Sequence, residues 1–261
     1  MEFSPSIFTS VIDSYLPEPQ ASLLNGIIFG VDLKTTKSFY QQLKIVGLLH
    51  LVVLSGSNIT LIGAVVGNLT AYFSKRISIL ITVLTIISFV MFVGPQAPIV
   101  RAGIMGILTY VAILTGRRNI ALYSLILSAI FIGVVFPKWL TSISMQLSYG
   151  ATLGLILFGR KDVRNPVYGE LRTSLAAQIF TTPLIFICFK QISFISPFAN
   201  ILVAPIISPL MIFGFLTAFL GKINYLAGLL PAYICYGLLT YMVWVIELLS
   251  KLPFAFYQLG N

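Results

Sequence analysis

The chain has 261 residues, of which 58% are apolar and only 9% are charged, and its mean hydropathy is +0.99. Soluble domains contain about 45–50% apolar and about 25% charged residues, so this composition excludes a water-soluble globule. At about 20 residues per membrane crossing, the length accommodates about seven to nine transmembrane helices. We therefore expect an all-α integral membrane protein with one polytopic domain.

The formal net charge of +9 comes from 16 Lys and Arg against 7 Asp and Glu. In a membrane protein, such an excess is typical of basic loops that orient the spans. Basic residues inside or beside the helix bundle would instead attract a polyanion to a pore. Composition alone leaves both interpretations open.

Residues 1–44 mix charged and apolar side chains, which predicts short amphipathic helices lying at the membrane interface. The segment lacks the basic start and continuous apolar stretch of a signal peptide, so insertion should depend on the first internal span. That span is expected over residues 45–73. A break is predicted near residues 54–58, Leu-Ser-Gly-Ser-Asn, because glycine and polar side chains weaken the helix there.

Seven further apolar runs bring the expected number of crossings to eight, give or take one. The runs cover residues 77–93, 99–115, 119–136, 139–159, 173–189, 198–220 and 225–250. In the run 198–220, Pro205 and Pro209 remove backbone donors at membrane depth and predict a kinked or re-entrant helix. Loops after the first, third, fifth and seventh runs carry nine Lys or Arg against six on the other side, which predicts a cytoplasmic position for these loops and both termini outside.

Several polar side chains fall inside the apolar runs. They are His50, Ser55, Ser57, Asn58, Arg101, Gln146, Ser148, Gln178, Asn200 and Glu247. A charged side chain at membrane depth is costly unless it is paired or hydrated, so each should face the bundle or a wet cavity. For the hydroxyls and amides, the alternative is hydrogen bonding between helices. For Arg101, the alternatives are a side chain that extends to the loop over residues 94–98 and a fixed positive charge beside a path for anions.

His50 and Ser55 raise the question of an intramembrane hydrolase. On a regular helix five residues separate side chains by about 140°, so these two point apart, whereas His50 and Ser57 share a face. No carboxylate in the segment can orient the imidazole, so we expect no catalytic residue and no enzyme activity. With one histidine, and with Cys188 and Cys235 in apolar runs, we expect no metal site and no cofactor.

Two pairs of glycines, Gly63 with Gly67 and Gly150 with Gly154, have the four-residue spacing that lets helix backbones approach each other. The spacing indicates helix contacts and not a particular function. Aromatic residues make up 13% of the chain and suit interfacial belts, although rings that line a groove can also stack on single-stranded bases.

The segment over residues 47–56 resembles a known family signature. The string Gly47-Leu48-Leu49-His50-Leu51-Val52-Val53-Leu54-Ser55-Gly56 is similar to the Gly-x-x-His-Leu-x-x-x-Ser-Gly motif of the competence domain of ComEC/Rec2 proteins, the membrane channel of natural DNA uptake. Further landmarks of the family follow in the same order: Pro98-Ile99-Val100-Arg101-Ala102, Met105, Gly116-Arg117, Pro137, Gln146-Leu147-Ser148-Tyr149, Ala151, Gln178, Thr182-Pro183, Ser196-Pro197, Asn200 and Pro205. With Leu24, Gly26 and Gly30 upstream, the match covers roughly residues 23–253. Asn58 and Met145 depart from the pattern, where the family often has histidine and phenylalanine.

The resemblance implies a channel or translocase core that conducts single-stranded DNA across the bacterial cytoplasmic (inner) membrane during natural transformation. With the interfacial segment over residues 1–44 that the charge pattern predicts, the resemblance implies a competence transmembrane domain over residues 45–253. Residues expected to line or gate the DNA passage are His50, Ser55, Gly56, Asn58, Arg101, Gln146, Ser148, Gln178, Asn200, Pro205 and Pro209. Expected partners are single-stranded DNA, membrane lipid and other competence proteins, namely a DNA receptor, a helicase or ATPase and a separate nuclease.

The separate nuclease is expected because many family members add an extracytoplasmic OB-like domain before this core and a metallo-β-lactamase-like domain after it, whereas this sequence starts and stops at the core. One histidine cannot supply the metal cluster of such a nuclease. Two other classes stay open: a transporter of a small solute or lipid-linked substrate, and an assembly subunit without a path of its own.

Overall fold

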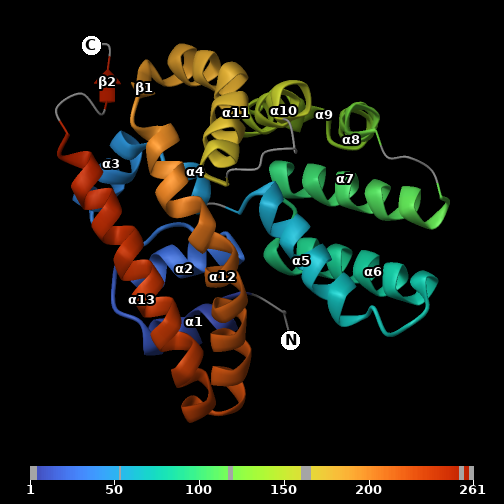
Figure 1. Cartoon of the computed structure of the whole chain (residues 1–261), viewed down its shortest axis with the longest axis horizontal. Coiled ribbons are helices and arrows are strands. Elements are labelled where there is room, and N and C mark those ends of the chain that lie inside the picture. Colours follow the sequence, from blue (N-terminus) through green and yellow to red (C-terminus); the bar gives the residue numbers. More distant parts are fainter. Residues whose placement is uncertain (1–4, 53, 117–119, 160–165, 253–255, 259–261) are drawn as a thin grey trace. The chain divides into compact units, whose positions relative to one another are not determined.

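A computed structural model describes residues 5–52, 54–116, 120–159, 166–252 and 256–258 of the chain (Figure 1). These residues are helical apart from turns, caps and one two-stranded sheet, which confirms the expected all-α membrane fold.

The chain divides into two compact units. The terminal unit contains Met1–Leu54, Asn165–Leu171 and Lys190–Asn261. The central unit contains Ser55–Arg164 and Arg172–Phe189.

Two long helices, α12 (Ser196–Ile223) and α13 (Tyr225–Ser250), form the frame of the terminal unit. They lie side by side and bury an apolar core between them (Figure 1). Asn224 joins them, and its side chain accepts a hydrogen bond from the Leu226 N–H at 2.8 Å, which caps α13. The strands β1 (Gln191–Ser193) and β2 (Phe256–Gln258) pair antiparallel in the same unit.

Shorter helices complete the terminal unit, and they have these bounds: α1 (Ser6–Tyr15), α2 (Gln20–Phe29), α3 (Lys37–Val46) and α4 (Leu49–Val52). The short helices expected before residue 45 are therefore present. All ten residues of α2 are buried, and α2 contacts both α12 and α13. A helix that lies on a membrane surface keeps a polar face exposed, so α2 is a core helix and not an interfacial one.

Of the kinked or re-entrant helix expected at Pro205 and Pro209, the interruption is absent, because α12 is helical from Ser196 to Ile223. A kink within α12 stays a prediction. Helices that span membranes tolerate proline where neighbouring helices and local adjustments satisfy the freed backbone groups. The break predicted near residues 54–58 is present, because α4 ends at Val52 and the next helix begins at Gly56.

Helices alone form the described part of the central unit, and they have these bounds: α5 (Gly56–Leu69), α6 (Lys75–Val93), α7 (Ala97–Leu114), α8 (Ala121–Val135), α9 (Pro137–Leu140), α10 (Ile143–Phe158) and α11 (Pro166–Phe189), whose first residues belong to the terminal unit. The helices α5, α6 and α7 pack on one another, and α10 contacts α7 and α8. The side chains of Ser74 and Ser142 cap α6 and α10 by accepting backbone N–H groups.

Within the described residues, five helical segments are long and apolar enough to cross a membrane: α6, α7, residues 168–189 of α11, α12 and α13. The runs expected to cross at 45–73, 119–136 and 139–159 contain α5, α8 and α10, which have only 14, 15 and 16 residues. Sixteen helical residues extend about 24 Å, which is less than the roughly 30 Å of a hydrocarbon core. By length and composition, the described helices therefore support five full-length crossings, where the sequence predicted about eight.

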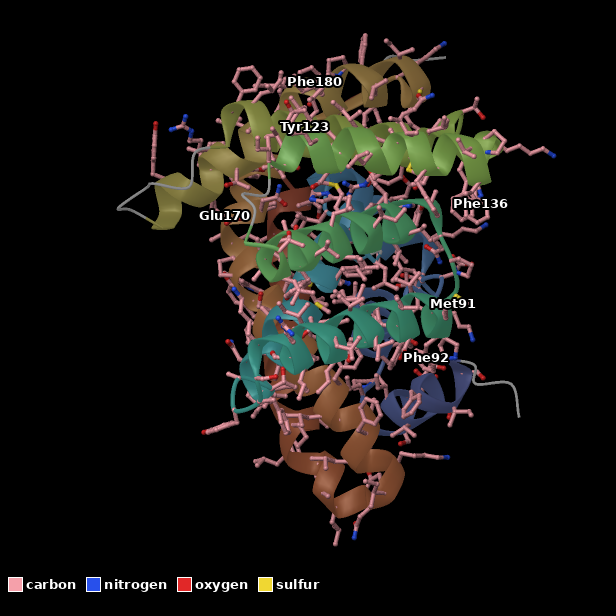
Figure 2. All side chains as sticks on the ribbon, turned by 90° about the vertical axis from the view of Figure 1, so that its right-hand side faces the viewer. Met91, Phe92, Tyr123, Phe136, Glu170 and Phe180 are labelled. Carbon is pink, nitrogen blue, oxygen red and sulfur yellow. The ribbon has the colours of Figure 1, made fainter. Side chains whose placement is uncertain are left out.

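Large apolar side chains are exposed on the helices of both units, as expected for a surface in contact with lipid. In the central unit, Met91, Tyr123 and Phe136 illustrate this exposure (Figure 2), with 69%, 63% and 37% of their surfaces exposed. The chain is a membrane protein, so each polar side chain buried among its helices needs a partner or a function.

Candidate functional site

The most deeply buried charge of the central unit is Arg101, the fifth residue of α7, which has 5% of its surface exposed. Its side chain turns toward α10, where Nε donates to Ser148 Oγ at 3.0 Å and Nη1 donates to Thr152 Oγ1 at 2.8 Å. Nη1 also lies 3.3 Å from the sulfur of Met105, one turn further along α7. Arg101 is therefore held inside the helix packing and does not extend to the loop over residues 94–98.

An aromatic ring of α10 lies beside the Arg101 guanidinium. The guanidinium carbon is 5.8 Å from the centroid of Tyr149, within range of a cation–π interaction. Tyr149 Oη lies 3.1 Å from Ser128 Oγ on α8, and Ser128 donates its own proton to the Leu125 carbonyl at 2.7 Å. Tyr149 is therefore the donor to Ser128. A continuous chain of polar contacts thus joins α7, α10 and α8 around the buried charge.

No carboxylate neutralises Arg101 among the described residues. The central unit has one acidic residue, Asp162, which lies outside the described ranges; the other acidic residues of the chain belong to the terminal unit. The partners of Arg101 are two hydroxyls, a thioether and a ring, and all of them are neutral. A buried cation in such surroundings favours an anion as its ligand, because neutral dipoles replace only part of its hydration.

The start of α5 gathers a second set of polar groups. Ser55 is extended (φ −118°, ψ 169°) and precedes Gly56, the first residue of the helix. The hydroxyls of Ser55 and Ser57 lie 2.6 Å apart, and they lie 3.2 and 3.3 Å from Asn58 Oδ1. Asn58 is buried, whereas Ser57 is exposed, so the cluster extends from the interior of the unit to its surface.

Gly56 brings the start of α5 against Arg101. A Cβ atom on Gly56 would lie 3.3 Å from Nη2 of Arg101 and 3.4 Å from Cβ of Ala102. The N-terminus of a helix carries a partial positive charge and unpaired N–H groups. Two positive groups, the helix end and the guanidinium, therefore point to the same place without an acidic side chain between them in the described structure.

In the terminal unit, His50 belongs to a different cluster. Its Nδ1 lies 3.0 Å from the carbonyl oxygen of Gly47, and Ser196 Oγ donates to the same oxygen at 3.5 Å. Gly47 has a left-handed backbone (φ +75°) that ends α3, and Ser193 Oγ donates to the nearby Ile45 carbonyl at 2.7 Å. Three residues of the sequence motifs, Gly47, His50 and Ser196, thus hold one turn against the start of α12.

The remaining predicted passage residues lie on α10, α11 and α12. Gln146 is exposed on α10 and lies about 200° around the helix from Ser148, so it points away from Arg101. Gln178 is half-buried on α11. On α12, in the terminal unit, Asn200 is buried, Pro205 is exposed and Pro209 is half-buried. A role of these five residues in a passage stays a prediction.

Four residues of the Arg101 cluster were not among the predicted passage residues: Thr152, Tyr149, Met105 and Ser128. Tyr149 and Met105 entered only as landmarks of the family resemblance. The signal for Thr152 was present, because it follows Ser148 by four residues and so shares its helix face. Met105 follows Arg101 by the same spacing. Ser128 carried no signal, since a lone serine in an apolar helix has many structural uses.

The arrangement suits the binding of an anion. Among the described residues, no three side chains of His, Cys, Asp and Glu come together in a way that could hold a metal ion. The groups that do converge are hydrogen-bond donors and one permanent positive charge, which stabilise an anion without reacting with it.

Comparison with known proteins gives a family for the chain. The family described as Competence protein matches residues 27–261. An uncharacterized protein of Aquifex aeolicus (strain VF5) is 30% identical over 165 residues, which are 63% of this chain and 38% of the relative. The match therefore spans well under half of the length of that relative. No solved structure matches the chain.

The family match covers most of the chain, including the Gly47–Gly56 segment and the Arg101 cluster. The chain therefore belongs to the Competence protein family, that of the ComEC/Rec2 proteins, which connects it with competence, the uptake of DNA by cells.

Proposed function

We propose that this chain forms the membrane-embedded part of a conduit that carries single-stranded DNA across the bacterial cytoplasmic membrane. The observation that carries the proposal is Arg101, a buried positive charge whose partners among the described residues are all neutral. The family match supports the link to DNA, and the exposed apolar surface supports the membrane location.

The physical reasoning starts from what burial of Arg101 requires. An arginine at the centre of a membrane helix costs about 2.5–3.5 kcal/mol on insertion scales, which is an upper bound for Arg101 because it lies in the second turn of α7. Hydrogen bonds to two hydroxyls and the contact with an aromatic ring offset part of this cost, and an ion pair with a passing phosphate can offset more. Because a moving strand presents the same phosphate at each nucleotide, the site is satisfied during conduction and carries no preference for base sequence.

The neutral hydroxyls near Arg101 allow the DNA strand to be released as well as bound. Conduction requires that the strand bind well enough to enter and weakly enough to leave. Hydroxyls such as those of Ser55 and Ser57 interact with phosphate oxygens less strongly than further arginines would. A single charge lined by hydroxyls therefore fits a path better than a tight binding pocket.

In this proposal the chain conducts the strand and is not an enzyme. Capture of DNA, removal of the second strand and the driving force would come from separate partners: a DNA receptor, a nuclease and a helicase or ATPase. The site described here contains binding groups, and it requires another protein for each of these steps.

The test is DNA uptake in a competent strain that lacks its own copy of the gene and is complemented with variants of this chain. Arg101→Gln should lower uptake at least about tenfold, as expected for the loss of a hydrogen-bonded charge. Arg76→Gln is the matched control, because it removes one arginine from an exposed position at the start of α6. Equal uptake by both variants, at equal membrane levels, would remove Arg101 from the path.

Flux into liposomes separates the conduit from the other function classes. Purified wild-type chain should admit a labelled single-stranded oligonucleotide, and Arg101→Gln should admit less. Saturable uptake of a small solute without oligonucleotide entry would instead identify a solute transporter. Entry of neither would indicate an assembly subunit, and both of these results contradict the proposal.

A further inference from the structure

We infer that the N-terminus of α5 and the Arg101 guanidinium together form a binding site for one phosphodiester group of the DNA strand. The inference rests on the proposed function and specifies the atoms that meet the strand. It is supported by three hydrogen-bond donors at Gly56 that have no partner among the described residues.

The first two donors belong to the backbone of α5. The Asn58 N–H donates to the Ser55 carbonyl at 3.2 Å, whereas the N–H groups of Gly56 and Ser57 make no hydrogen bond to described residues. Such groups at a helix start need a partner from a side chain, water or a ligand. Ser55 occupies the capping position, yet its side chain makes no capping hydrogen bond. The helix end is therefore open to an anion.

The third donor is the Nη2 group of Arg101. Nε and Nη1 are engaged by Ser148 and Thr152, and Nη2 makes no hydrogen bond to the described residues. Nη2 faces Gly56, because a Cβ there would lie 3.3 Å from it. Arg101 has 5% of its surface exposed, and one amino group of its guanidinium makes no hydrogen bond to the described residues and faces a helix N-terminus, which is the composition of an anion site.

The chemistry of the donors favours a phosphodiester. Its two non-bridging oxygens can take hydrogen bonds from the helix amides and from Nη2 at the same time. Its single negative charge balances the single positive charge of Arg101. Ser57 is exposed next to Gly56, so its hydroxyl is available to the next phosphate of a strand.

Gly56 allows a matched pair of substitutions that isolates one donor. Gly56→Pro removes the N–H group, and proline is favoured at the first position of a helix. The extended backbone of Ser55 (φ −118°, ψ 169°) is the conformation that a residue before proline prefers. Gly56→Ala adds the same Cβ atom next to Nη2 but keeps the N–H group. The comparison of the two variants therefore reports the amide.

The measurement is fluorescence anisotropy of a labelled oligothymidylate of about 12 nucleotides with purified chain in phosphatidylcholine nanodiscs. Gly56→Pro should bind about 10- to 100-fold more weakly than Gly56→Ala, as expected for a lost hydrogen bond to a charged acceptor. With a methylphosphonate oligomer, whose backbone is neutral, the difference between the two variants should disappear. Thermal midpoints of both proteins verify that they are folded.

The salt dependence of oligonucleotide binding by Arg101→Gln provides a second, independent test of the site. Each phosphate neutralised on a single strand contributes about −0.7 to the slope of log K against log salt concentration. The slope should therefore become less steep by about 0.7 in Arg101→Gln. It should be unchanged in Arg76→Gln, which lies at an exposed position on α6.

Each contrary result identifies what fails. If wild type binds the oligonucleotide but Gly56→Pro equals Gly56→Ala and Arg101→Gln keeps the wild-type slope, this site is overturned and the conduit stands. If wild type binds no oligonucleotide, the proposed function itself is overturned. If the variants lose co-purified anionic phospholipid while oligonucleotide binding is unaltered, the occupant is a lipid headgroup and the inference is wrong.

Discussion

Replacing Gly154 by alanine should destabilise the central unit, because α10 and α11 meet there backbone to backbone. A Cβ atom on Gly154 would overlap the carbonyl oxygen of Ala176 and would lie 3.0 Å from the Ala176 carbonyl carbon and 3.3 Å from Cα of Ala177. None of these atoms is the end of a flexible side chain, so the overlap is relieved only if the helices separate. Overpacking of this kind costs about 1–3 kcal/mol.

Gly150, one turn earlier on α10, provides the matched control. A Cβ atom on Gly150 would lie 3.4 Å from Cβ of Phe180 and 3.6 Å from Cδ1 of Leu184, which are ordinary contacts. Alanine is favoured over glycine inside a helix by about 0.5–1 kcal/mol. Gly150→Ala should therefore be neutral or stabilising. Both substitutions gain this helix preference, so they should differ by the overpacking cost alone, about 1–3 kcal/mol in the free energy of unfolding.

Tryptophan fluorescence can assign the effect to the central unit. The chain has two tryptophans, Trp139 in the central unit and Trp244 in the terminal unit. In a Trp244→Phe background, thermal unfolding in one detergent is reported by Trp139 alone. The midpoint should fall with Gly154→Ala and stay or rise with Gly150→Ala. A midpoint for Gly154→Ala equal to or above that for Gly150→Ala would refute the backbone contact between α10 and α11.

Three further predictions concern the two polar clusters. Tyr149→Leu should lower the thermal midpoint more than Tyr149→Phe, because only the leucine variant loses the cation–π contact with Arg101, worth about 0.5–2 kcal/mol; equal midpoints would contradict this. Thr152→Val keeps the shape but removes the acceptor of Nη1, and should destabilise the central unit by about 1.5–3 kcal/mol in denaturant unfolding; an unchanged midpoint would show that the bond is not needed. Gly47→Ala should destabilise the terminal unit by more than about 2 kcal/mol, because alanine disfavours φ +75° and its Cβ would lie 2.8 Å from Cβ of Ser196. Unfolding followed by Trp244 fluorescence tests this, and a wild-type midpoint would exclude this turn geometry.

The general fold could be predicted from the sequence because apolar runs and their interruptions are local features. The break before Gly56 followed from Ser55, Gly56 and Ser57 themselves, and the structure has it. The number of full-length crossings did not follow, because helix ends depend on local caps and turns. Pro137, for example, starts the separate short helix α9, which includes Trp139 and Leu140 from the start of the run expected over 139–159. Ser142 then caps α10, so the helix within that run is shorter than expected.

Proline illustrates why local rules are insufficient at membrane depth. Pro205 and Pro209 predicted a broken helix, and α12 is continuous instead. The rule describes the loss of one backbone donor, whereas the outcome depends on the neighbours of the helix. Here α12 packs along α13, and such packing stabilises a helix despite the missing hydrogen bonds. A single sequence does not report which neighbours a helix will have.

The candidate site could be predicted in part. Arg101 and Ser148 were both expected near a passage, and their side chains are in direct contact although 47 residues separate them. Their partnership required the packing of α7 on α10, which no spacing within one helix can predict. Tyr149 and Ser128 became part of the site only through the packing of α8 and α10.

The electrostatics of the central unit connect its fold with the proposed function. If Arg101 served only to pack α7 on α10, either of two simpler arrangements would be expected. An apolar side chain in its place would avoid burying a charge, or a carboxylate beside it would neutralise the charge. The described residues of the central unit show neither arrangement. They include no acidic side chain, and Nη2 of Arg101 faces the start of α5, which is itself positive. Two positive groups placed against each other destabilise an empty site and stabilise an occupied one. The arrangement is therefore understandable when the missing negative charge arrives with a ligand, and a strand of phosphates supplies it at each step.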